Sequence, residues 1–111
     1  MNVEEVKIIA KACHAMNSRF CEIVGDKVLD WDTMPSDIRV SICLGVENAL
    51  RGCTPEESHY NWLEFRTNSG WTYGERDDDA KTHPCMLPYD KLPPAQKAKD
   101  KIFLAVVEAL K

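Results

Sequence analysis

Residues 70–74 place two aromatic side chains, Trp71 and Tyr73, between two glycines. Glycine adds nothing to a packed core and weakens regular structure, but an aromatic ring on a tight turn can present its face to a ligand or to another chain. Stacking of Trp71 on a nucleobase would contribute about 1–3 kcal/mol whatever the base. The alternative is that Trp71 fills a gap between this turn and a helix. Strand alternation puts Trp71 and Tyr73 on one face, and we predict a recognition element here.

Cationic side chains near this turn are candidates for holding the phosphates of a ligand. Arg76 can form bidentate hydrogen bonds, and Lys81 lies at the other end of the same charged run, residues 75–81. Arg66, on a predicted helix just before the turn, is a third candidate. The alternative is a solvated loop whose charges neutralise one another, with Asp77 capping a short turn.

His83 is a further candidate for contact with a ligand. Because Pro84 follows it, its backbone is expected to be extended, and its ring can hydrogen-bond either a ligand or the neighbouring backbone. His59 and Trp62 precede the turn on the same predicted helix. We predict that these two side chains pack the helix against the turn.

The sequence argues against metal binding and catalysis. An EF-hand loop beginning at Asp77 would need a glycine at its sixth position and a glutamate at its twelfth, where this chain has Thr82 and Pro88. The five cysteines are odd in number and have no CxxC spacing, which favours reduced thiols in a cytoplasmic protein. No glycine-rich phosphate loop of the Walker or Rossmann type is present. We therefore predict a protein that is not an enzyme and uses no metal or cofactor.

Length and charge restrict the partners. A chain of 111 residues is expected to form one domain with one core. Its formal net charge of −4, without a long basic block, argues against duplex DNA or RNA as a partner. No apolar run reaches the roughly 18 residues that a membrane span needs, and the acidic residues 1–5 lack the basic region of a signal peptide. These features predict a cytoplasmic protein without membrane contact.

The apolar periodicity predicts a mainly α fold, with about four helices packed with one short two-stranded antiparallel β element. Residues 3–24 carry an apolar stripe at steps of three and four: Val6, Ile9, Cys13, Met16, Phe20 and Ile23. Further helices are predicted over 36–51, from the capping motif Thr54-Pro55-Glu56-Glu57 to about residue 68, and over 94–110. The β element is expected to pair residues 71–73 with residues 85–87.

From Ser58 onward the chain resembles a ryanodine-receptor (RyR) domain. The residues that carry the resemblance agree in order, spacing and type: His59, Trp62, Gly70-Trp71-Thr72-Tyr73-Gly74, Asp77, Lys81, His83-Pro84-Cys85, Pro88-Tyr89, Leu92-Pro93 and Asp100. The N-terminal half resembles the lead-in of small stand-alone members from bacteria and their phages through Cys21-Glu22, Trp31 and Gly45-Val46. We therefore expect residues 1–111 to form a single RyR-like domain, with 1–53 as a helical lead-in and 54–111 as the RyR motif region.

The resemblance implies a binding function without catalysis. Paired RyR repeats of calcium-release channels have been linked to adenine-nucleotide binding at the tryptophan of the GWxYG motif, and prokaryotic copies to nucleotide-derived signals in host–phage conflict. We therefore expect a sensor or sequestering module for an adenine nucleotide or a nucleotide-derived signal, with these residues at the ligand: Trp71, Tyr73, Arg76, Lys81, Arg66 and His83. The alternative is a protein–protein interaction module that uses the same aromatic surface. Because the channel repeats act in pairs and this chain holds one copy, we also expect a homodimer.

Overall fold

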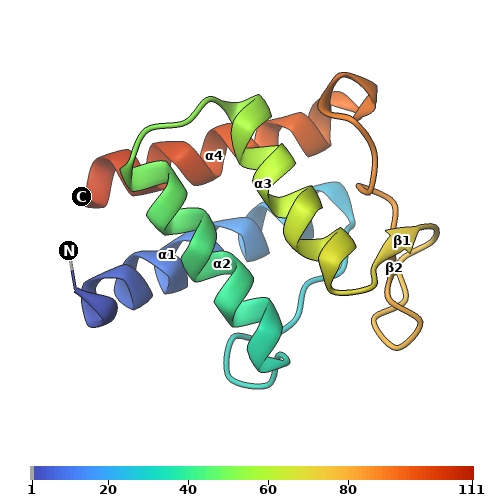
Figure 1. Cartoon of the computed structure of the whole chain (residues 1–111), viewed down its shortest axis with the longest axis horizontal. Coiled ribbons are helices and arrows are strands. Elements are labelled where there is room, and N and C mark those ends of the chain that lie inside the picture. Colours follow the sequence, from blue (N-terminus) through green and yellow to red (C-terminus); the bar gives the residue numbers. More distant parts are fainter. Residues whose placement is uncertain (1) are drawn as a thin grey trace.

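The structure, a computed structural model, describes residues 2–111 and consists mainly of helices (Figure 1). The helices are α1 (Val3–Val24), α2 (Ser36–Leu50), α3 (Pro55–Asn68) and α4 (Pro94–Leu110). Between α3 and α4 lie a sheet of two short strands, β1 (Thr72–Tyr73) and β2 (Thr82–His83), and a 3-10 turn, η1 (Tyr89–Lys91). The predictions of a mainly α fold and of helices at these four places in the chain are confirmed.

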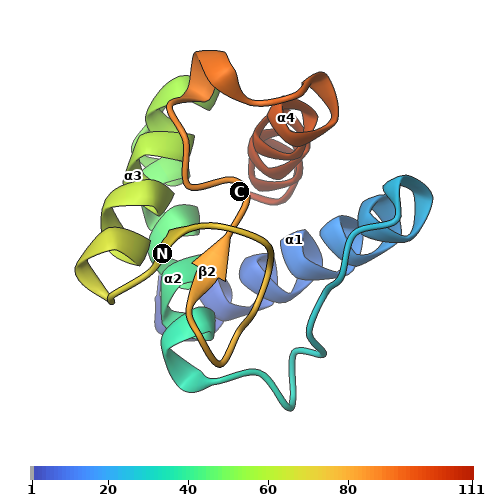
Figure 2. The ribbon, with the colours of Figure 1, turned by 90° about the vertical axis from the view of Figure 1, so that its right-hand side faces the viewer.

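The helices form two crossing pairs. Helices α1 and α4 pack side by side, and α2 and α3 cross in front of them (Figure 1). Both ends of the chain lie at one end of the bundle and the sheet lies at the other. Viewed from the sheet end, the segment from β1 to β2 extends across the bundle (Figure 2). The sequence region with the aromatic and charged motifs therefore forms one end of the molecule.

Capping chemistry explains where α1 and α3 begin and where α1 ends. The side chain of Asn2 accepts a hydrogen bond of 2.9 Å from the N–H of Glu5 at the start of α1. Thr54 and Glu57 form the predicted capping box at the start of α3, which satisfies two N–H groups that no helical carbonyl can reach. Gly25 ends α1 in the left-handed region, with φ of 81°, where a side chain would add strain.

The main core lies where α1 meets α2 and α4. The first three residues of the predicted stripe on α1, namely Val6, Ile9 and Cys13, are buried in this core. The second half of the stripe lies largely outside this core, since Met16 is 51% exposed and Ile23 is 82% exposed. Alternating steps of three and four residues average less than the 3.6 residues of a helical turn, so the stripe drifts around the helix and leaves the core.

The two strands are parallel, and the predicted antiparallel pairing is wrong. Thr72 of β1 lies opposite Thr82 of β2, in the same direction. The intervening residues 74–81 fold into a closed loop: the Asp77 carboxylate accepts hydrogen bonds from two N–H groups further along the loop, and Asp77 forms an antiparallel bridge with Thr82. The chain thereby reverses direction twice, between β1 and Asp77 and again between Asp77 and Thr82, and enters β2 parallel to β1. The predicted turn-capping role of Asp77 is confirmed.

The second strand also lies earlier in the chain than predicted. Residues 85–87 form a turn, in which the N–H of Leu87 donates to the carbonyl of Cys85. Prolines at 84 and 88 bound this segment and remove N–H donors that a strand ladder would use. The residue types and the flanking prolines were therefore a misleading signal for a strand at 85–87.

Two further observations concern the whole described chain. In residues 2–111, no helix combines the length and the apolar character of a membrane-spanning segment. All five cysteines carry free thiols.

Candidate functional site

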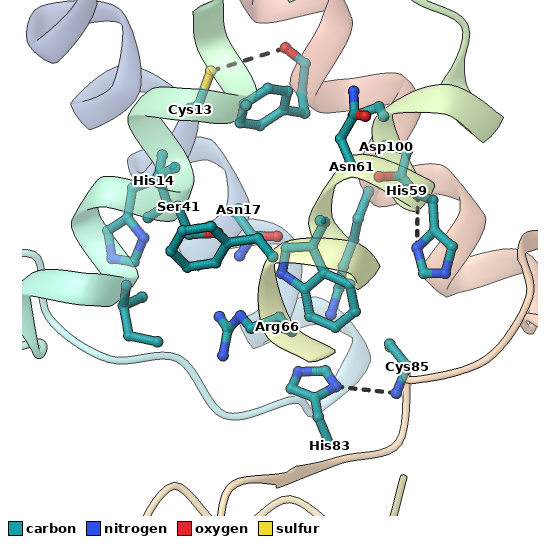
Figure 3. A pocket seen from close by; sticks show the side chains of 18 of the residues that line it. Cys13, His14, Asn17, Ser41, His59, Asn61, Arg66, His83, Cys85 and Asp100 are labelled. Atoms are coloured by element: carbon teal, nitrogen blue, oxygen red, sulfur yellow. Dashed lines mark hydrogen bonds and ion pairs between the residues drawn. The ribbon is translucent and has the colours of Figure 1, made fainter. Parts of the chain in front are cut away.

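A pocket of about 450 Å³ lies between the four helices and the segment that follows β1. This volume is within the range of small-molecule sites. Its polar lining comes from all four helices and β2, and includes His14, Asn17, Ser41, His59, Asn61, Arg66, His83 and Asp100 (Figure 3). Among the six predicted ligand contacts, Arg66, Arg76 and His83 line the pocket, whereas Trp71, Tyr73 and Lys81 lie outside its lining.

Arg66 is a buried cation of this pocket and has no anionic partner. It is on the last turn of α3, and its guanidinium carbon lies 5.2 Å from the centre of the Trp62 ring and 4.5 Å from that of the Trp71 ring. Only 8% of Arg66 is exposed. Within residues 2–111 it forms no ion pair, and its Nε has no hydrogen-bond partner. Burial, assisted by the nearby charge of Arg76, lowers the pKa of Arg66 to about 10, and the charges of Asp37 and Asp78 oppose this shift without overcoming it.

The buried Trp71 ring packs against the Arg66 guanidinium. Gly70 has φ of 92°, and the N–H groups of Gly70 and Trp71 donate to the carbonyls of Thr67 and Arg66 at 3.1 and 2.9 Å. These two bonds form a Schellman ending of α3, which turns the Trp71 ring back onto the Arg66 side chain. Trp71 is 5% exposed and packs with Ile38 of α2. The geometry thus favours the packing interpretation of Trp71 over that of a ring open to a base.

Tyr73 and Lys81 point away from the pocket. Tyr73 is 62% exposed, so it does not share a face with the buried Trp71, contrary to the strand-alternation prediction. The reason is that β1 begins only after Trp71, whose position is set by the helix ending. Lys81 donates from Nζ to the carbonyl of Ser69 at 2.9 Å, where a cation stabilises the C-terminal end of α3.

Trp62 forms the aromatic wall of the pocket. Its ring stacks on that of His59 at 5.6 Å between centres and meets that of His83 edge-on at 5.2 Å. The predicted packing of the helix against the β element is confirmed for Trp62 by its contact with His83 of β2, whereas the His59 ring contacts Tyr89 of η1. The position of Trp62 in the pocket lining was missed. A signal was present in the sequence: His59, Trp62 and Arg66 are spaced by three and four residues, which places them along one face of a helix.

His83 presents an N–H donor to the pocket. Its Nδ1 accepts a hydrogen bond of 3.0 Å from the N–H of Cys85, so the proton of the neutral ring is on Nε2. Burial, followed by the charges of Arg76 and Arg66, lowers the pKa of His83 to about 4. The ring is therefore neutral at physiological pH. The predicted backbone hydrogen bond is confirmed, and the other ring nitrogen is left for a ligand.

Arg76 fastens the charged loop to the segment between α1 and α2. Its Nη1 donates to the carbonyl of Lys27 at 2.6 Å, and its Nε pairs with Asp78 at 3.3 Å. The side chain also lines the pocket. The charge neutralisation considered for this loop therefore occurs within the Arg76–Asp78 pair, while Arg76 still adds positive potential beside Arg66.

Lys99 is a pocket cation that the sequence analysis missed. Its Nζ lies 2.7 Å from Asp26, which also accepts a hydrogen bond of 2.8 Å from Gln96. Burial raises the pKa of the Asp26 carboxyl, but the hydrogen bonds from Lys99 and Gln96 outweigh it, and the pKa is lowered overall. Nothing in the sequence around Lys99 resembles a ligand motif, because the partner that positions it is distant in the chain.

The family model of the RyR domain matches residues 37–111. The match begins at the first turn of α2, inside the segment that we had assigned to the helical lead-in, and continues through α3, the sheet and α4. It includes Trp62, Arg66, Arg76 and His83 of the pocket lining and Trp71 beside Arg66. Since this match spans more than half of the 111 residues, the chain belongs to the RyR domain family.

Proposed function

We propose that this RyR domain is a non-enzymatic module that binds a small anionic ligand in the pocket between its helices. The observation that carries the proposal is the Arg66 side chain, which is 8% exposed and lacks an anionic partner within residues 2–111. A buried charge that forms no direct ion pair is unfavourable for folding. An anionic ligand beside Arg66 would remove this cost and would gain a charge-assisted hydrogen bond.

The charges of the pocket support the same conclusion. Its lining contains four cations, Lys27, Arg66, Arg76 and Lys99, and two carboxyl groups, Glu64 and Asp100. The chain as a whole has a formal net charge of −4. Arg76 and Lys99 are paired with Asp78 and Asp26, so the charges that remain to attract an anion are those of Arg66 and Lys27.

An adenine nucleotide, or a signal derived from one, is the form of ligand that we propose. The Trp62 ring is only partly buried and lines the pocket, so it can offer a face to a base. Arg66 and His83 supply donors for phosphate on the same wall. Membership of the RyR family supports adenine as the base. In this proposal the Trp62 ring stacks on the base. The Trp71 ring packs against the Arg66 guanidinium and so helps to position it.

A screen of ligands against the wild-type protein tests this proposal. We expect pyrophosphate, AMP and ATP to raise the melting temperature, and adenosine, which has no phosphate, to raise it much less. A ligand at 100 times its Kd should stabilise the fold by about 2.7 kcal/mol. If none of the phosphate compounds stabilises the protein, the proposal is wrong, and the protein-interaction alternative, in which Tyr73 and its exposed surroundings dock a partner chain, would replace it.

Arg66→Met provides a sharper version of this test. Methionine keeps an unbranched stem between the two tryptophan rings but removes the unpaired charge. We expect the ligand-free variant to be as stable as the wild type or more stable, and to lose binding of pyrophosphate at least tenfold. Arg19→Met is the matched control, because Arg19 lies on α1 with a side chain that is 78% exposed. Unchanged pyrophosphate binding by Arg66→Met would contradict the assignment.

A further inference from the structure

The pocket has a second polar group, made by His59 of α3 and Asp100 of α4 (Figure 3). Nε2 of His59 lies 2.6 Å from the carbonyl of Leu87. Because a carbonyl only accepts hydrogen bonds, Nε2 carries a proton, and Nδ1 of the neutral ring is an acceptor. His59 is 4% exposed, so its ring is largely enclosed by the protein.

Nδ1 of His59 faces another acceptor. It lies 3.9 Å from Oδ2 of Asp100, which is too long for a hydrogen bond. The Asp100 side chain is 18% exposed, and within residues 2–111 no group donates a hydrogen bond to its carboxyl oxygens. Burial raises the pKa of Asp100 to about 7, which is the expected consequence of a carboxylate without donors. Nδ1 of His59 and the carboxyl of Asp100 therefore lie close together in the pocket lining, and no other group of residues 2–111 donates a hydrogen bond to either.

Donors and acceptors are separated along one helix. His59, Trp62 and Arg66 follow one another on α3, and the helical rise places the backbones of His59 and Arg66 about 10 Å apart. The Trp62 ring touches the rings of His59 and His83 and so bridges the two ends. The Arg66 end offers donors to an anion, and the His59 end offers acceptors to a group that donates.

We propose that Asp100 and His59 form a subsite for the sugar hydroxyls of the ligand whose phosphate lies at Arg66. A carboxylate is a suitable acceptor for ribose hydroxyls, and adjacent hydroxyls could donate to Asp100 and to Nδ1 of His59 together. This inference rests on the proposed function and narrows it to phosphorylated ligands with free hydroxyls on their sugar. The ligand would lie along α3, with its phosphate toward the sheet and its hydroxyls toward η1 and α4.

Binding of AMP, of 2′,3′-dideoxy-AMP and of pyrophosphate, measured by calorimetry, tests the inference. We expect wild-type protein to prefer AMP to the dideoxy compound by roughly ten- to a hundredfold, the usual range for a hydrogen bond to a charged group. Asp100→Asn should lose most of this preference and bind pyrophosphate as the wild type does. Asp90→Asn is the matched control: Asp90 is exposed, lies in η1 and is outside the pocket lining.

The outcomes separate this inference from the proposed function. Equal affinity of the wild type for AMP and the dideoxy compound would overturn the hydroxyl subsite, and this comparison needs no variant. A preference that survives in Asp100→Asn would also overturn it. Absence of binding by both pyrophosphate and AMP would overturn the phosphate site itself, and the subsite with it. Loss of the preference in Asp100→Asn alone, with pyrophosphate binding intact, is the result that supports the subsite.

Discussion

Replacement of Trp71 by alanine is expected to affect the stability of the fold more than the binding of a ligand. The ring is 5% exposed and packs with Met34 and Ile38 on one side and under the Arg66 guanidinium on the other. Truncation of a buried tryptophan to alanine costs about 3–5 kcal/mol. A domain of this size has a total stability of about 5–15 kcal/mol, so the variant is expected to retain a fold with a small margin.

Thermal unfolding followed by circular dichroism measures this loss. At roughly 4 °C per kcal/mol for a chain of this length, Trp71→Ala should lower the melting temperature by about 12–20 °C. Trp62→Ala is the internal comparison, because that ring is only partly buried. We expect Trp62→Ala to lower the free energy of unfolding by about 1–2 kcal/mol and to weaken the binding of AMP to the folded protein.

The two tryptophan variants therefore separate packing from recognition. A melting temperature of Trp71→Ala within a few degrees of the wild type would refute the burial argument. So would loss of AMP binding in Trp71→Ala under conditions where it is fully folded, combined with normal binding by Trp62→Ala. That pair of results would return the stacking role to Trp71 and would require the turn at Gly70 to open when a ligand binds.

Two other predictions follow from charge and exposure. The folded-state pKa of Asp100, about 7, exceeds its ordinary value of 3.8, so this carboxyl lowers stability as pH rises from about 4 to 7. His83, with its pKa lowered to about 4, has the opposite effect on stability. Comparison of Asp100→Asn with the wild type isolates the contribution of Asp100: in urea unfolding, the free energy of unfolding of the variant minus that of the wild type should increase over this pH range. A constant difference would contradict the assignment. We also propose a homodimer, since apolar Val3, Ile8 and Ile23 of α1 are largely exposed; light scattering at micromolar concentration should give about twice the mass of one chain, and a single-chain mass would refute it.

The helices could be predicted because their determinants are local. A capping box at Thr54, a glycine after Val24 and an apolar stripe on α1 all act within a few residues of the feature that they control. The sheet could not be predicted in the same way. Its direction depends on the internal turn of residues 74–81 around Asp77, and short strands contribute too little sequence to define their own pairing.

The pocket was only partly predictable for a related reason. The arginines and His83 were identified from their chemical types, and they line the pocket. Trp71 was misjudged because its sequence neighbours, two glycines and a tyrosine, suggested a surface. Its environment is set instead by the ending of α3, which points the ring inward. Lys99 is positioned by Asp26, far away in the chain, and no local pattern reveals such a pair.

The spacing of His59, Trp62 and Arg66 shows how far sequence reasoning extends here. Their positions at i, i+3 and i+7 imply a shared face of α3, and that face is what the structure shows. The spacing alone does not reveal that Arg66 meets no carboxylate, or that His59 faces another acceptor, since both facts depend on α4 and on the turn after β2. Most buried polar groups in proteins are paired. The buried Nε of Arg66, which has no partner within residues 2–111, is an exception. A fold tolerates such a local conflict chiefly where it has a function, and the proposed ligand, with an anion at one end and hydroxyls at the other, would supply partners to Arg66, His59 and Asp100 together.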